Sequence, residues 1–221
     1  DFRGAISNLQ VKPSRKDLFN GVKGTYVNPD NNWQAADFPA YTKQINATSL
    51  VAGNRVQIVT LGTTDFTLIG ASTNAVGVTF TATGPGTGTG TVEGYIVEDA
   101  GERIWNDVEF PFTTSEATAQ RIGKIMLERV RQPISFVAKL KLTALQIQTT
   151  DVIMVTFSRY GWSSKPFRVE QFTLAVDTDQ QGHPVLGCDL LLRETAAGIY
   201  NWNTEEKAVD VAPNTSLPNP F

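Results

Sequence analysis

The chain has 221 residues and a formal net charge of −3. This length allows one large β domain or two small ones, and the charge gives no basic field for nucleic acid. No apolar run reaches the roughly 18 residues that span a membrane, and the lone Cys188 excludes a disulfide framework within the chain.

Short runs of Val, Thr, Ile and Phe between turn residues are typical of an antiparallel β protein. The clearest strand follows Pro133, where apolar residues alternate with mostly polar ones. Strands are predicted near 21–27, 56–61, 78–83, 92–97, 104–110, 134–142, 152–157, 166–176 and 184–194.

One stretch predicts a helix. Thr113 and Glu116 have the spacing of a capping box, with Thr113 as the N-cap. Apolar residues then recur at helical spacing as far as Val130, and Pro133 ends the pattern. We expect a single amphipathic helix of about five turns that packs across a sheet or a barrel mouth.

Composition changes sharply between Asn46 and Glu93, where Arg55 and Asp65 are the only charged residues inside the segment. We interpret 46–93 as a small all-β module inserted into a β domain made of 1–45 and 94–212. The abrupt start at Asp1 and the proline-rich end suggest a piece of a longer protein, with 213–221 as a linker toward missing downstream domains.

The run "TATGPGTGTGTVEG", residues 81–94, raises the possibility of a phosphate-binding loop. A dinucleotide loop needs G-x-G-x-x-G before a helix, and a P-loop needs Lys followed by Ser or Thr after its last glycine. Here the glycines alternate, no lysine follows, and the next residues favour a strand. We therefore predict the last edge of the inserted module and its return to the main domain.

Other chemistry has little support in the sequence. His183, the only histidine, lies in a turn, and Cys188 follows in a strand, so a catalytic dyad would rest on these two alone. One His and one Cys cannot complete a zinc site, and "NPDNN" (28–32) lacks the pattern of a calcium loop and is interpreted as a turn. We predict no enzyme activity, no cofactor and no metal.

Two clusters leave alternatives open. The carboxylates of a glycan hydrolase would come from Glu98, Asp99, Glu102, Asp107 and Glu109, although such runs are usually solvated loops. Aromatic and basic residues mix in 158–170, which suits nucleic acid or glycan, but Trp162 is interpreted first as an anchor at a hairpin tip.

Two blocks carry a resemblance, residues 18–41 and 98–172. The features are the "NNWQ…DFP" turn, "ERIW…E.PFTT…ATAQRI" before and within the helix, and "GWSSKPF.V". In these the chain resembles the phage tail protein family of central tail hub, or tip attachment, proteins. The closing "LLLRETAAGIYNWN" and "PNTSLPNP" look like that family's passage toward downstream modules.

The resemblance implies a structural role in the virion, after synthesis in the cytoplasm of the bacterial host. Tail-hub-like β-barrel or sheet domains of a homotrimer would close the six-fold tail tube and join the tube and distal tail proteins to the receptor-binding tip. Such a ring needs closed, heterologous interfaces. We expect Trp33, Phe38, Trp105 and Trp162 either to anchor this fold or to lie at subunit or receptor contacts.

The chain departs from the family at 46–93, a segment that itself resembles a small β-module scattered through phage structural proteins. A glycan- or receptor-binding module of the tail tip, with this segment and Trp162 as its contact surface, is the second reading. A tail-associated cell-wall hydrolase that uses Glu102 and Glu109 is the third.

Overall fold

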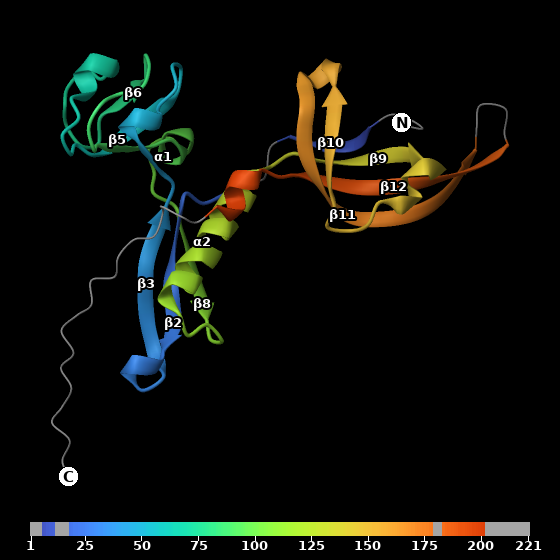
Figure 1. Cartoon of the computed structure of the whole chain (residues 1–221), viewed down its shortest axis with the longest axis horizontal. Helices are drawn as coiled ribbons and strands as arrows, with labels where there is room; N and C mark the ends of the chain where they lie inside the picture. Colours follow the sequence, from blue (N-terminus) through green and yellow to red (C-terminus); the bar gives the residue numbers. More distant parts are fainter. Residues whose placement is uncertain (1–5, 12–17, 179–182, 202–221) are drawn as a thin grey trace, which may run out of the picture. The chain divides into compact units, whose positions relative to one another are not determined.

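The computed structural model describes residues 6–11, 18–178 and 183–201, which form strands, helices and short 3-10 turns (Figure 1). The strands make three sheets and two helices accompany them, so the expected mainly β, α+β fold is confirmed. The chain divides into two compact units, and the inserted module at 46–93 stays a prediction. The first unit is built on β1 (Ser7–Gln10) and 128–201, and the second on 19–127. The predicted linker at 213–221 lies outside the described residues.

The first unit is a five-stranded antiparallel sheet in the order β1-β9-β12-β11-β10. Alternate residues of its strands point to one face, where Phe136, Phe167, Val169, Leu190 and Leu192 form a fully buried core. The strands are β1 (Ser7–Gln10), β9 (Ser135–Lys141), β10 (Val152–Phe157), β11 (Trp162–Thr178) and β12 (Pro184–Glu194).

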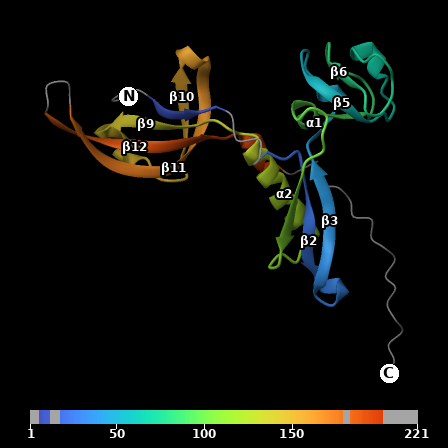
Figure 2. The same ribbon diagram turned by 180° about the vertical axis from the view of Figure 1, so that it is seen from behind.

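The β11–β12 hairpin projects beyond the neighbouring strands of this sheet (Figures 1 and 2). Pairing between β9 and β12 ends where Lys141 lies opposite Gly187, whereas β11 and β12 continue to pair as far as Thr178 and Pro184. The end of the hairpin is therefore two strands wide in the described part of the sheet.

The second unit contains a three-stranded sheet in the order β3-β2-β8 and the helix α2 beside it (Figure 1). Ala119 and Leu127 of α2 are buried against Val22 and Phe38, so the helix packs on this sheet as predicted. The elements are β2 (Gly21–Asn28), β3 (Gln34–Thr42), β8 (Trp105–Phe110) and α2 (Glu116–Val130). The described strands pair antiparallel, as predicted, except β2 and β8, which run parallel.

The start of α2 differs from the predicted capping box. The helix begins at Glu116, and Ser115 accepts a hydrogen bond from the Thr118 amide through its hydroxyl at 3.4 Å. Glu116 is therefore the first helical residue rather than the third, and it cannot reach back as a capping-box acid does. Ser115, not Thr113, occupies the capping position, and the fifteen-residue helix is nearer four turns than five.

A second sheet in this unit has the order β4-β7-β5-β6 and a core of its own around Val56, Ile58, Phe66 and Val92. Its strands are β4 (Gln44–Asn46), β5 (Arg55–Thr60), β6 (Thr79–Thr81) and β7 (Thr91–Glu93). β7 pairs with both β4 and β5, so it is an inner strand and not the predicted edge. Residues 95–97, predicted as strand, belong to the short helix α1 (Tyr95–Glu98).

The glycine strap, residues 84–90, packs against the core residues Ile69 and Phe66 and leads into β7. The Gly86 amide donates to the Ala47 carbonyl at 2.8 Å, and the Gly90 amide donates to the Thr64 hydroxyl at 2.9 Å. A Cβ atom on Gly90 would stand 2.7 Å from the Phe66 ring, a distance that no ordinary contact permits. Close packing therefore requires glycine at this position, and a strand follows it where a phosphate loop would continue as a helix.

Candidate functional site

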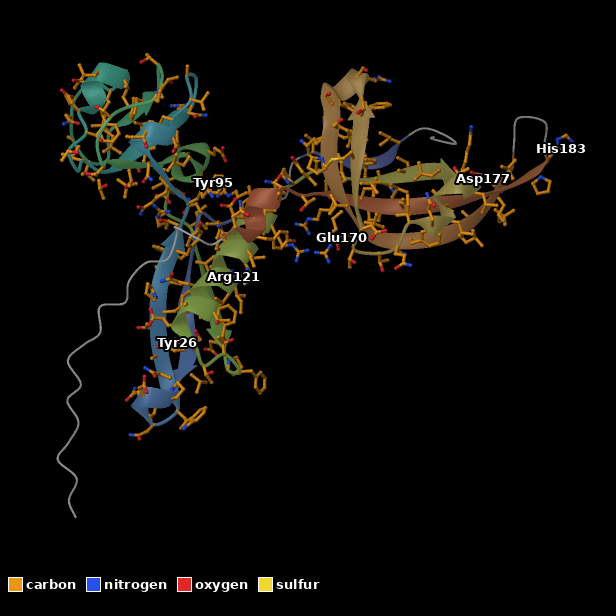
Figure 3. The ribbon with its side chains drawn as sticks, viewed as in Figure 1. Tyr26, Tyr95, Arg121, Glu170, Asp177 and His183 are labelled. Carbon is orange, nitrogen blue, oxygen red and sulfur yellow. The ribbon has the colours of Figure 1, made fainter. Side chains whose placement is uncertain are left out.

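A groove of about 520 Å³ lies in the second unit, where the chain leaves the four-stranded sheet and enters α1. Its apolar lining comes from Ile45, Val56 and Val97, and Tyr95 of α1 adds an aromatic ring (Figure 3). Its polar lining consists of Lys43, Asn54, Arg55 and Glu98, and Gly53 and Gly94 contribute only backbone. The groove is formed because α1 packs beside the start of β5.

The groove carries an excess of positive charge, with two cations against one carboxylate. The Arg55 side chain is exposed, and it forms no hydrogen bond or ion pair with any residue that the structure describes. Asn54 uses its side-chain oxygen to accept from the Val51 amide at 3.0 Å, which fixes the amide group at the groove. An unpaired guanidinium beside an oriented amide suits a ligand that carries both a negative charge and hydroxyl groups.

Asn20 fixes the far end of α1 although it is distant in sequence. Its fully buried side chain donates to the Asp99 carboxylate at 2.8 Å and to the Glu102 carbonyl at 2.6 Å, and it accepts from the Ile104 amide at 2.9 Å. Because Asp99 is the C-cap of α1, these bonds hold the helix and the turn after it against β2.

Arg103 fixes the other end of α1. Its guanidinium forms a two-point ion pair with Glu93, the last residue of β7, whose carboxylate is buried. The same guanidinium donates to the Asn20 backbone carbonyl at 3.0 Å and lies 5.4 Å from the ring centroid of Trp105. Both ends of α1 are therefore tied to the same network, and this network positions the side of the groove that α1 forms.

Of the four aromatic residues singled out in the sequence, two are buried and two are exposed. Phe38 and Trp162 are buried, Phe38 under α2 and Trp162 at the turn between β10 and β11, where its ring contacts Phe136. Trp33 is 67% exposed at the β2–β3 turn and has a left-handed backbone (φ 61°), and Trp105 is 40% exposed beneath Arg103. Trp33 and Trp105 thus have surface to offer a partner, whereas Phe38 and Trp162 stabilise the fold.

The acidic residues of 98–109 do not converge on one site. Asp99 is hydrogen-bonded to Asn20, and Asp107 forms an exposed ion pair with Lys23 at 3.5 Å. Asp107 and Glu109 project from β8 into solvent, whereas the general acid of a glycosidase is held in a buried environment. Glu98 lines the groove and Glu102 lies in the turn after α1.

His183 and Cys188 lie too far apart to act together. His183 is exposed at the end of the β11–β12 hairpin (Figure 3), and Cys188 is fully buried in the core. Five residues of extended strand separate them, roughly 16 Å. Within the described ranges, no three His, Cys, Asp or Glu residues lie close enough to hold a metal ion. The "NPDNN" segment is a turn, as predicted, in which Asn28 accepts from the Asp30 amide.

Shifted pKa values occur away from the groove. Burial raises the pKa of the Glu116 carboxyl, and burial followed by the charges of Glu116 and Asp30 raises the pKa of the Tyr26 phenol. Hydrogen bonds from the Thr67 hydroxyl and then from its amide lower the pKa of Asp65. Local burial and capping explain these shifts, so they mark no shared catalytic centre.

No protein-family model and no curated protein matches the chain. Among the residues that the structure describes, no helix combines the length and the apolar character needed to cross a membrane.

Sequence reasoning missed the groove and the exposed hairpin end. The signal for the groove was Arg55, one of two charged residues in an otherwise uncharged segment. The other lining residues Lys43 and Tyr95 lie outside that segment. Only the pairing of β4, β5 and β7 brings them and Arg55 to one groove.

Proposed function

We propose that the chain is a structural subunit of a phage tail tip, a hub that links the tail tube to the receptor-binding tip. Two kinds of observation support this proposal. The first is the resemblance of 18–41 and 98–172 to tail hub proteins. The second, which carries the proposal, is the exposed apolar surface at the end of the β11–β12 hairpin.

This hairpin surface consists of Leu174, Val176 and Leu186, which are 52%, 71% and 42% exposed. In the strand register Val176 lies opposite Leu186, and Leu174 lies opposite the buried Cys188. The three side chains therefore continue the core face of the sheet into solvent. A contiguous apolar face at the end of a two-stranded projection is typical of a site that a protein partner covers.

The partner that we propose for this surface is another copy of the chain. A closed ring of copies needs a heterologous contact, in which a projection of one subunit rests on a different surface of the next. The opposite face of the same sheet provides apolar surface as well, because Val152 and Met154 of β10 are 55% and 66% exposed. In the assembled tail the ring would contact the tube and distal tail proteins, in virions assembled in the bacterial cytoplasm.

The mass of the chain in solution tests this proposal. We expect a species at three times the chain mass of 24.1 kDa in light scattering across a concentration series. Val176→Asp places a charge on the hairpin surface and should shift the population to monomer. A monomeric wild-type chain at every concentration, or a trimer that persists in the Val176→Asp variant, would contradict the proposed contact.

A further inference from the structure

We propose that the groove beside α1 binds an acidic saccharide, a sugar that carries a carboxylate or a phosphate. This binding activity goes beyond the assembly role and does not depend on it. Ligand sites usually enclose about 300–1,000 Å³, and this groove of about 520 Å³ falls within that range. Because it is open along one side, it suits a segment of a longer glycan.

The negative charge of the ligand is indicated by Arg55. Its guanidinium is exposed and unpaired among the described residues, and Lys43 lines the same groove. Guanidinium groups bind carboxylates and phosphates through two parallel hydrogen bonds, and such charge-assisted bonds are stronger than neutral ones. The groove therefore favours an anionic ligand over a neutral one.

The saccharide character is indicated by the rest of the lining. Ile45 and Tyr95, both half-buried, border the groove with apolar surface for the C–H face of a sugar, above the buried Val56. The Asn54 amide donates hydrogen bonds and the Glu98 carboxylate accepts them, which matches the hydroxyl groups around such a ring. A purely acidic peptide would meet repulsion from Glu98, whereas a hydroxylated ligand can donate to it.

Gly94 allows this idea to be tested without disturbing the fold. It lines the groove, its backbone (φ −92°) is accessible to any residue, and an added Cβ would meet only the Arg55 carbonyl, at 4.0 Å. A leucine can therefore be placed at this lining position without backbone strain, and it should narrow the groove. Arg55→Gln removes the charge, and Arg121→Gln in α2 is a matched control on an exposed arginine outside the groove lining.

The test is a calorimetric titration of the full chain with trigalacturonate, with a sugar phosphate, and with neutral galactose oligomers. We expect one acidic sugar at least to bind, with about tenfold weaker binding of the neutral oligomer. Arg55→Gln and Gly94→Leu should each weaken binding of the acidic sugar about tenfold or more, and Arg121→Gln should leave it unchanged. The carboxylate and phosphate arms show which acidic group is preferred.

Several results would overturn the proposal. These are no binding of either acidic sugar, equal affinity of the wild type and the Gly94→Leu variant, and binding of inorganic phosphate or hexaglutamate as tight as that of the acidic sugar. Circular dichroism of each variant verifies the fold, and the two groove variants act through different chemistry, so a folding defect in one leaves the other as the test. The proposed self-association is read from the mass and is independent of all these outcomes.

Discussion

Replacement of Gly90 by alanine should destabilise the four-stranded sheet, whereas the same change at Gly84 should not. Both residues lie in the glycine strap. A Cβ atom on Gly90 would stand 2.7 Å from both the Leu61 carbonyl oxygen and the Phe66 ring, but one on Gly84 would have no neighbour within 4 Å. Neither glycine has a left-handed backbone, so the two substitutions differ in steric fit rather than in backbone strain.

The size of the effect follows from two opposing contributions. Overpacking of a close contact costs about 1–3 kcal/mol. A glycine-to-alanine change also restricts the unfolded chain, which stabilises the folded state by roughly 0.4–1 kcal/mol at both positions. Because the second contribution is common to both variants, their free energies of unfolding should differ by the overpacking cost of about 1–3 kcal/mol, with Gly84→Ala at or above the wild type.

Hydrogen exchange of the amides in β5 and β7 measures this difference locally. A gap of about 1–3 kcal/mol corresponds to exchange roughly 5- to 150-fold faster in Gly90→Ala than in Gly84→Ala. Tryptophan fluorescence is unsuitable because the segment 46–93 contains no tryptophan. Equal exchange rates in the two variants would refute the steric reason for the glycine at position 90.

Three further predictions concern the second unit. Ser115→Ala should lower the free energy of unfolding by about 1 kcal/mol in thermal denaturation, because it removes the N-cap hydroxyl of α2. Thr113→Ala should have little effect. A larger loss with Thr113→Ala would instead support Thr113 as the N-cap. Asp65 has a pKa below its ordinary value of 3.8, so its contribution to stability is present above that value and is lost as the pH falls through the folded pKa. Thr67→Val should move that pKa upward in an NMR titration, and an unchanged value would assign the shift elsewhere. Asn20→Ala removes a fully buried amide and its four side-chain hydrogen bonds. It should lower the free energy of unfolding in urea by about 3 kcal/mol. A loss under about 1 kcal/mol would mean that water takes the place of the lost hydrogen bonds.

Most strands were predictable because their side chains alternate or because apolar runs lie between turns. β3 was not, because Pro39 and the polar residues around it obscure the pattern. The structure explains why proline is tolerated there: β3 is an edge strand, whose outward amides need no partner. Residues 95–97 look like a strand, but the chain turns at Gly94 into α1, whose ends are held by Asn20 and Arg103.

The contacts that define the groove and the parallel pair could not be read from local sequence. β2 and β8 are separated by β3, the four-stranded sheet and α1, and parallel strands need such a crossover connection rather than a tight turn, so local sequence does not reveal the pair. Arg55 could be noted as an isolated charge, yet its position beside Lys43 depends on pairing across about forty residues. Exposure of Val176 likewise depends on where β9 ends and not on its own strand.

The pairing of β4 with β7 brings the two ends of 44–93 together. Gln44 lies opposite Glu93 in this antiparallel pair, so the chain enters and leaves the segment at points about 5 Å apart. A host protein needs to open only a single turn to accept such an insert, and excision leaves a gap that a two-residue turn can close. The meeting of the two ends therefore predicts that the rest of the second unit could be rejoined by a short turn, although Arg103 would then lose its buried partner Glu93.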